Sequence, residues 1–240
     1  MDYGSYLDDA LAYTRQGIIA NVNRWAALIL ALICLGIPLN GYVMRIYRGE
    51  NPAPEVDRWG TLFIDGLRLL VVGLIYAIPV IIIWAYIYGG MLLGVFTGTT
   101  DAALLDTWEP DMALTALLYL VEIIVGFFVP VASIRFARSG RFAEAFNFSA
   151  IVETIGKIGW LAYLVALIII TLVIAIPVII LVVGFIVIMG VAMYAINTAI
   201  LLVFGLLGAF LLILLILSPL LTVFQARYMT RVYDSAETPA

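Results

Sequence analysis

Long runs of apolar residues, separated by short polar stretches, dominate the sequence. The longest run, residues 158–225, extends for about 68 residues without a charged side chain. A helix crosses the hydrocarbon core of a bilayer with roughly 20 apolar residues, so this run can hold two crossings, or three if it folds back twice. The pattern predicts helices embedded in a membrane.

Five stretches meet the same criterion, and together they predict an all-α integral membrane protein with one transmembrane domain over residues 25–232. A sixth crossing would require residues 158–225 to turn back among residues with almost no turn signal. The predicted crossings cover residues 25–44, 66–96, 112–134, 157–190 and 198–224.

Two shorter segments, residues 5–23 and 139–156, have the spacing of amphipathic helices. The first belongs to an N-terminal segment over residues 1–24, which is expected to lie in the headgroup layer or in water. The chain then ends in a short polar tail over residues 233–240.

The basic residues are distributed unevenly about the predicted crossings. With five crossings, ten of the 12 Lys and Arg residues fall on one side, while Arg15, Arg24 and the acidic loop 97–111 fall on the other. The positive-inside rule then predicts that the basic loops and the C-terminus are cytoplasmic and that the N-terminus is outside. The ten residues are Arg45, Arg48, Arg58, Arg68, Arg135, Arg138, Arg141, Lys157, Arg227 and Arg231.

Several landmarks occur more than once. The string Ala-Ile-Pro-Val-Ile-Ile occupies residues 77–82 and again residues 175–180. Each odd crossing also has a proline followed five to eight residues later by an arginine. A two-crossing unit repeated in the same orientation would explain both patterns, and convergence on common membrane residues is the alternative. The proline–arginine pairs are Pro38 and Arg45, Pro130 and Arg135, and Pro219 and Arg227.

Prolines and glycines mark the long even-numbered crossings. Pro79 and Pro177 lie inside them and are predicted to kink the helices. Gly90, Gly94 and Gly98 are four residues apart, which gives one helix face a flat stripe that permits close helix contact. That contact is expected within the chain, or between copies in a homo-oligomer.

Few polar side chains occur at membrane depth. Glu122 lies near the middle of the third crossing, where a carboxylate is costly unless it is neutral or paired. It is therefore the best candidate for a functional residue, with a structural hydrogen bond between helices as the alternative. Asp65 and Arg68 are spaced for an ion pair on one helix face, and Asn197 and Thr198 are expected at the last outer turn.

Basic and aromatic residues on the basic side of the predicted domain are candidates for contacts with lipid headgroups. A role in setting the topology explains the arginines equally well. The candidates are Arg45, Arg48, Trp59, Arg68, Arg135 and Arg138.

The composition excludes several kinds of site. Hydrophobic residues make up 65% of the chain and charged residues 12%, against about 25% charged in soluble domains. Histidine is absent and Cys34 is the only cysteine, so an intramolecular disulfide, a Cys-based zinc or iron–sulfur site and a catalytic Ser–His or Cys–His pair cannot form. No metal or cofactor and no enzymatic activity are predicted, and the net charge of −4 argues against nucleic acid as a partner.

The segment Gly41-Tyr-Val-Met-Arg45, then Pro54, Trp59-Gly-Thr-Leu-Phe-Ile-Asp65-Gly-Leu67 and Ile75-Tyr-Ala-Ile-Pro79, is distinctive. It resembles an uncharacterised, largely archaeal membrane family, catalogued as domain of unknown function number 4013. The resemblance is strongest over residues 25–83. It implies a multi-pass plasma-membrane protein and supplies no activity or functional residues.

These patterns predict a non-enzymatic helical bundle that binds lipid or moves a small solute, with Glu122 as its best single site residue. The alternative is a structural or assembly subunit of a larger membrane complex, packed through the glycine stripe. Transport predicts polar residues that converge on Glu122, whereas assembly predicts an exposed face of small residues.

Overall fold

The computed structural model describes residues 1–99, 109–195 and 200–237. Nearly all of these residues are helical, and short connections separate the helices. In chain order the elements are α1 (Tyr3–Thr14), the π-helical turn η1 (Arg15–Ile19), α2 (Val22–Ile33), α3 (Ile37–Tyr47), α4 (Trp59–Thr97), α6 (Met112–Ser139), the 3₁₀ turn η2 (Phe142–Phe146), α7 (Phe148–Ile158), α8 (Trp160–Ala195) and α9 (Ile200–Asp234).

Four helices, α4, α6, α8 and α9, are long and apolar enough to cross a membrane. A fifth crossing arises only if Tyr3–Ile19 and Val22–Ile33, which meet at 94°, are counted together. Only 6–17% of the most apolar window of each long helix is buried inside the protein, so most of that surface can face lipid. The predicted all-α membrane fold is confirmed, and α8 and α9 occupy the 158–225 run with two long helices.

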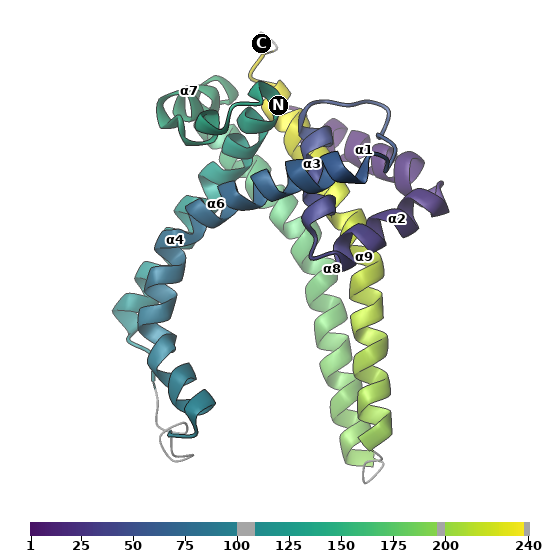
Figure 1. Ribbon diagram of the computed structural model, residues 1–240, viewed down its shortest axis with the longest axis vertical. Coiled ribbons are helices and arrows are strands. Elements are labelled where there is room, and N and C mark those ends of the chain that lie inside the picture. Colours follow the sequence, from purple (N-terminus) through teal and green to yellow (C-terminus); the bar gives the residue numbers. More distant parts are fainter. Residues whose placement is uncertain (100–108, 196–199, 238–240) are drawn as a thin grey trace.

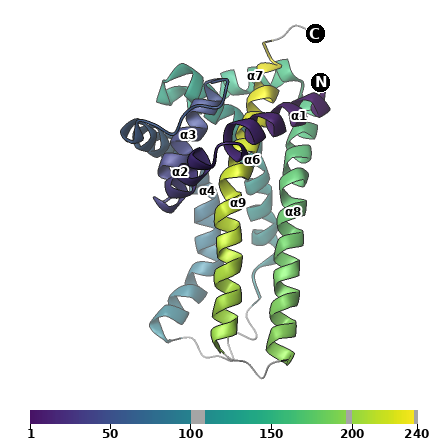
Figure 2. The same cartoon turned by 90° about the vertical axis from the view of Figure 1, so that its right-hand side faces the viewer.

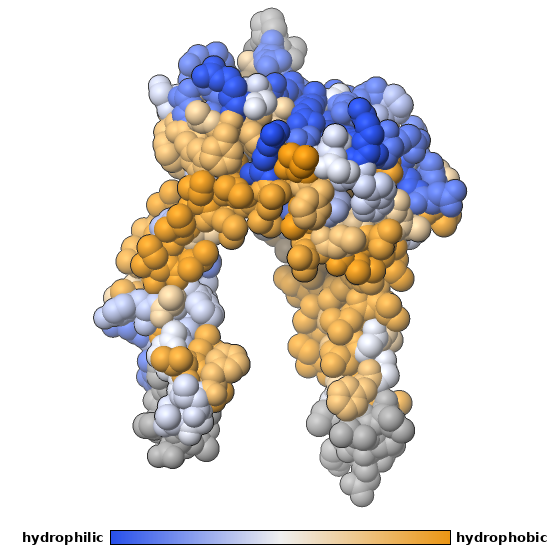
Figure 3. All heavy atoms as spheres, in the orientation of Figure 1, coloured by the Kyte–Doolittle hydropathy of each residue, from blue (hydrophilic) through white to orange (hydrophobic). Residues whose placement is uncertain are grey.

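The long helices form two hairpins, α4 with α6 and α8 with α9, which diverge from a shared base (Figures 1 and 2). The N-terminus, α1, α7 and the end of α9 lie at that base. Hydrophilic residues gather there, and apolar residues cover much of the two hairpins below (Figure 3). The base is therefore the polar end of the molecule, and it carries most of the buried core.

The predicted first crossing over residues 25–44 is wrong as a single helix. The chain breaks between α2 and α3, where Leu35 and Gly36 adopt positive φ values of 60° and 68°. Pro38 lies in the first turn of α3, where its missing N–H costs no hydrogen bond. With 12 residues, α2 is roughly 18 Å long, which is too short for a core of about 30 Å. Residues 25–44 instead fall on two short helices, α2 and α3, at the polar end.

Two glycines bring α3 and α4 into backbone contact. A Cβ on Gly41 would lie 1.9 Å from the carbonyl oxygen of Leu62, and a Cβ on Gly66 would lie 1.7 Å from that of Ile37. Neither position can hold a larger residue without separating the helices. The contact at Gly41 and Gly66 fixes the position of α4 at the base of the α4–α6 hairpin. The glycine spacing in the sequence predicts close helix contact at a different set, Gly90, Gly94 and Gly98.

The glycine stripe itself makes no such contact within the chain at the two positions where its surroundings are defined. Among the described residues, a Cβ on Gly90 or on Gly98, which ends α4 with a φ of 66°, would meet no atom within 4 Å. The expected packing within the chain is therefore not found at these residues. Helices α4 and α8 continue through Pro79 and Pro177, and their kinks stay predictions, as does the internal repeat.

Tyrosine hydroxyls join the elements of the base. Tyr163 on α8 donates a hydrogen bond to the carbonyl oxygen of Phe127 on α6, at 2.8 Å, and Tyr76 on α4 donates to that of Ala145 in η2, at 2.7 Å. Ile151 and Ile155 of α7 are completely buried. The predicted amphipathic segment 139–156 therefore folds as η2 and α7, and α7 packs its apolar face onto this core.

Candidate functional site at the polar end

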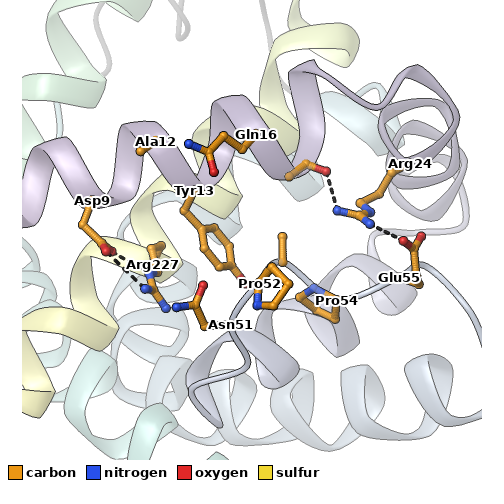
Figure 4. A pocket seen from close by; sticks show the side chains of 12 residues that line it. Asp9, Ala12, Tyr13, Gln16, Arg24, Asn51, Pro52, Pro54, Glu55 and Arg227 are labelled. Carbon is orange, nitrogen blue, oxygen red and sulfur yellow. Dashed lines mark hydrogen bonds and ion pairs between the residues drawn. The ribbon is translucent and has the colours of Figure 1, made fainter.

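A pocket of about 450 Å³ opens at the polar end between α1, the segment that connects α3 to α4, and α9 (Figure 4). It contains two arginine–carboxylate pairs, and Figure 4 places one pair at each end of the pocket. The lining residues are Asp9, Ala12, Tyr13, Gln16, Gly17, Arg24, Asn51, Pro52, Ala53, Pro54, Glu55 and Arg227.

At one end, Asp9 of α1 binds two arginines of α9. The Nε atom of Arg227 donates to Asp9 at 2.6 Å, and the Nη2 atom of Arg231 donates to the same carboxylate at 2.6 Å. The guanidinium of Arg227 also lies over the ring of Tyr13, 4.5 Å from its centroid, which is a favourable cation–π distance. These contacts fasten α1 to the end of α9.

At the other end, Arg24 is nine-tenths buried, with 10% of its side chain exposed, whereas 69% of the Glu55 side chain is exposed. Arg24 donates to the carbonyl oxygen of Gly17 at 2.6 Å and pairs with Glu55. Its Nε atom is buried and has no hydrogen-bond partner among the described residues. A buried guanidinium with an unused donor is costly, so this end of the pocket favours an additional acceptor.

The same contacts set the protonation of the pocket. Burial raises the pKa of Asp9, but the hydrogen bonds from Arg227 and Arg231 outweigh it and hold the pKa below its ordinary value of 3.8. Burial raises the pKa of Tyr13 to about 12, and its hydroxyl donates to the carbonyl oxygen of Glu50 at 3.0 Å. The lining thus contains two carboxylates, Asp9 and Glu55, and two arginines, Arg24 and Arg227, while Arg231 binds Asp9 from outside the lining.

Arg45, a predicted headgroup contact, instead supports the wall of this pocket. It is 5% exposed, and its Nη1 atom donates to Asp57 at 2.6 Å and to the carbonyl oxygen of Glu55 at 2.7 Å. The hydrogen bond from Arg45 to the Asp57 carboxylate holds the pKa of Asp57 below its usual value. Arg45 thus fixes the course of residues 55–57.

The other predicted headgroup residues have mixed surroundings. Arg48 pairs with Asp65 at 2.7 Å, which is closer than the predicted Asp65–Arg68 pair at 3.7 Å. Arg135 binds Glu144 at 2.7 Å. Arg138 donates to the carbonyl oxygen of Tyr47 at 2.8 Å and pairs with Asp234. The remaining two, Arg68 and Trp59, keep exposed side chains.

The contact between Asp9 and Arg227 also places α1 beside the end of α9. Placing the N-terminus opposite the C-terminus required residues 25–44 to cross the membrane. Because that stretch is broken and α1 binds α9, the N-terminus and the end of α9 lie at the same end (Figure 1). Arg24 and Arg227 accordingly line the same pocket at that end.

Glu122 is exposed on the surface of α6. In the part of the chain that the structure describes, no hydrogen bond or ion pair involves this carboxylate, so a polar path converging on it has no support there. The acidic-loop residues Asp101 and Asp106, and the turn residues Asn197 and Thr198, lie outside the described residues. Among the residues that are described, no group of three His, Cys, Asp or Glu could hold a metal ion.

Sequence reasoning did not connect Asp9, Arg24 and Arg227 into a site. Their partners lie 31 to 218 residues away along the chain, and no local spacing reveals such pairs. The one available signal was the acidic pair Asp8 and Asp9 in a short amphipathic helix, since a carboxylate beside an apolar face often serves to bind an arginine.

The comparisons with known proteins agree with the membrane fold. Residues 25–183 match the family described as Protein of unknown function (DUF4013). No curated protein matches the chain, and no solved structure does. The family match covers more than half of the 240 residues and includes all the motifs that carried the resemblance. The chain therefore belongs to the family Protein of unknown function (DUF4013).

Proposed function

We propose that this protein binds a zwitterionic phospholipid headgroup in the pocket between α1, residues 49–58 and α9. The observation that carries the proposal is the buried Nε atom of Arg24, which has no partner among the described residues and lies beside an open pocket. Guanidinium groups bind phosphate through two parallel hydrogen bonds, more strongly than they hold a solvent-exposed carboxylate. The phosphate would take the place of Glu55 on Arg24.

The neutral charge balance of the lining favours a headgroup that carries both charges. A phosphate on Arg24 releases Glu55, and the released carboxylate can then bind an ammonium group, as in phosphatidylethanolamine. Exposed apolar side chains of α1, η1 and α2 provide a surface for the acyl chains. These are Leu11, Ile19, Val22 and Leu30, which are 45–70% exposed.

The proposal places the polar end in the cytoplasmic leaflet of the plasma membrane. Four helices would cross completely, α2 and α3 would enter the bilayer and return, and both termini would be cytoplasmic, because the arginines gather at that end. The hydrogen bond of 3.0 Å from the Trp25 indole to the carbonyl oxygen of Ile216 supports partial entry, since Ile216 lies well within the apolar run of α9.

Native mass spectrometry in mild detergent tests this function. The wild-type protein with added phosphatidylethanolamine is expected to retain one lipid, and Arg24→Gln is expected to lose it. Arg141→Gln is the matched control, since it removes the same charge from the same end of the molecule, outside the pocket. Equal retention by Arg24→Gln and the wild type, with both folded by circular dichroism, would contradict the proposal.

A further inference from the structure

A second pocket, of about 370 Å³, lies where the α4–α6 hairpin meets η2 and α7, and it shares no lining residue with the headgroup pocket. Figure 1 shows α7 beside the upper part of this hairpin. All of the lining side chains are apolar or aromatic, and the volume falls within the usual range for small-molecule sites, about 300–1,000 Å³. The lining residues are Ile75, Tyr76 and Pro79 of α4, Ile124, Val125 and Phe128 of α6, Phe146 of η2 and Phe148 of α7.

Aromatic contacts fix one side of this apolar pocket. The ring of Tyr76 stacks on that of Phe146, with the centroids 5.5 Å apart, and meets the edge of the Phe148 ring at 6.2 Å. The Tyr76 hydroxyl donates a hydrogen bond to the carbonyl oxygen of Ala145 at 2.7 Å. Because this hydroxyl is engaged with η2, the ring of Tyr76 lines the pocket as an apolar surface. The pocket therefore offers an occupant hydrocarbon contacts.

The apolar pocket opens on the surface of the hairpin. The side chains at its opening are partly exposed, with Ile75 at 40%, Ile124 at 48% and Phe148 at 54%. Helices α4 and α6 are long and apolar enough to cross a membrane, so this surface meets the hydrocarbon chains of lipids. One such chain suits a space of about 370 Å³, whereas a helix of a partner protein is about 10–12 Å wide with its side chains.

A cationic side chain lies on the same side of α4, nearer the polar end. Arg68 precedes Ile75 by seven residues and Pro79 by eleven, which are about two and three helical turns, and it lies roughly 10 Å along the helix from Ile75. Its side chain is 60% exposed, and its ion pair with Asp65 is long, at 3.7 Å. Asp65 binds Arg48 more closely, at 2.7 Å. The charge of Arg68 is thus available to an anion from outside the chain.

We propose that the apolar pocket binds one hydrocarbon chain of an anionic phospholipid, whose phosphate binds Arg68. The charges around the site decide the headgroup class. Asp65 is held by Arg48, and Glu144, two residues before Phe146, is held by Arg135 at 2.7 Å. Neither carboxylate is released to bind an ammonium group, so a lipid with a net negative charge, such as phosphatidylglycerol, suits this site better than a zwitterionic one.

Native mass spectrometry with phosphatidylglycerol added to the protein in mild detergent tests the site. The wild type is expected to retain this lipid in preference to phosphatidylcholine. Arg68→Gln is expected to weaken binding about fivefold, as for the loss of one cation near a lipid surface. Ile124→Trp places a larger ring at the opening of the pocket and is expected to abolish retention.

Matched variants separate this site from general effects of charge and size. Arg58→Gln removes a 72% exposed arginine at the start of α4, and Ile123→Trp adds the same ring at the neighbouring, 69% exposed position of α6, outside the pocket. Both are expected to bind phosphatidylglycerol like the wild type. Arg24→Gln should do the same, because Arg24 belongs to the headgroup pocket, so either lipid site can fail without the other.

Photo-cross-linking then locates the lipid chain on the unaltered protein. Phosphatidylglycerol with a diazirine in one chain, added at one lipid per protein, is expected to label α4, α6 and α7 around the pocket. A label spread evenly over both hairpins would exclude the site, as would equal retention by Ile124→Trp and the wild type with both folded by circular dichroism. Equal binding by Arg68→Gln and Arg58→Gln, or equal retention of phosphatidylcholine, would exclude the anionic headgroup.

Discussion

The α4–α6 and α8–α9 hairpins are both built from long apolar helices, yet their outer surfaces differ. The exposed large side chains along the described part of α8 and α9 are almost all aliphatic. Helices α4 and α6 instead expose Tyr86, Tyr119 and Glu122 at membrane depth. Figure 3 shows the same contrast, since the α8–α9 hairpin is coloured mainly hydrophobic and the α4–α6 hairpin has hydrophilic areas along its lower half.

The difference indicates two roles. A helix that contacts only lipid needs no polar side chain on its surface and loses stability from one, so α8–α9 has the surface of a membrane anchor. The α4–α6 hairpin exposes two tyrosines and a carboxylate, which such a surface lacks. The two hairpins are also held to the shared base by different contacts. Backbone contact at Gly41 and Gly66 positions α4, whereas side-chain ion pairs connect α9 to α1.

The largest effect is expected from filling the backbone contact at the base of α4. Gly66→Ala places a methyl group against the carbonyl oxygen of Ile37 and is expected to cost about 3 kcal/mol or more. Gly205→Ala on α9 is the matched control, since a Cβ there meets nothing within 4 Å. Thermal unfolding in detergent compares the two, and equal melting temperatures would contradict the close α3–α4 contact.

A carboxylate transferred to the other hairpin is expected to have the next largest effect. Leu211 is 55% exposed on α9 and lies roughly 16 Å from the start of that helix, which matches Glu122 in depth. Leu211→Glu is expected to cost about 2.5–3.5 kcal/mol of membrane insertion, whereas Glu122→Leu should improve insertion of α6. A glycosylation-based insertion assay measures both, and unimpaired insertion of Leu211→Glu would remove the contrast between the hairpins.

The hydrogen bond that joins the two hairpins is expected to contribute less. Tyr163→Phe removes the bond from α8 to the carbonyl oxygen of Phe127, at an expected cost of about 1 kcal/mol. Tyr119→Phe removes an exposed hydroxyl and should leave the melting temperature of the detergent-solubilised monomer unchanged. Equal shifts in both variants would mean that the hydroxyl of Tyr163 does not hold the hairpins together.

The smallest effect concerns pH and the ion pairs at the base of α9. Because the pKa of Asp9 is lower in the folded protein than its ordinary 3.8, its contribution to stability is present above pH 3.8 and is lost as the pH falls through the folded value. Asp9→Asn should reduce this acid sensitivity and shift the melting temperature at pH 7 by no more than about 4 °C. A melting curve with the same pH dependence in the variant would exclude Asp9 as its source.

The sequence located the long helices well and the first crossing poorly. Predicted crossings at 66–96 and 112–134 fall within α4 and α6, because a run of apolar residues identifies a helix wherever it packs. Residues 25–44 have a similar hydropathy, but the positive φ values at Leu35 and Gly36, followed by Pro38, start a second helix. The presence of a proline did not distinguish this break from a continuous helix, because α4, α6, α8 and α9 each continue through a proline.

Membrane embedding and helix length follow from the sequence by itself, since the free energy of transfer into lipid is close to a sum over individual residues. The end at which the N-terminus lies, the glycines that touch and the arginines that line the pocket were decided by the tertiary structure. Asp9 and Arg227 are 218 residues apart in sequence, and their contact depends on how α1 folds back along α9. A pattern read along the chain contains residue types and spacings, whereas an ion pair depends on a distance that only the packed helices fix.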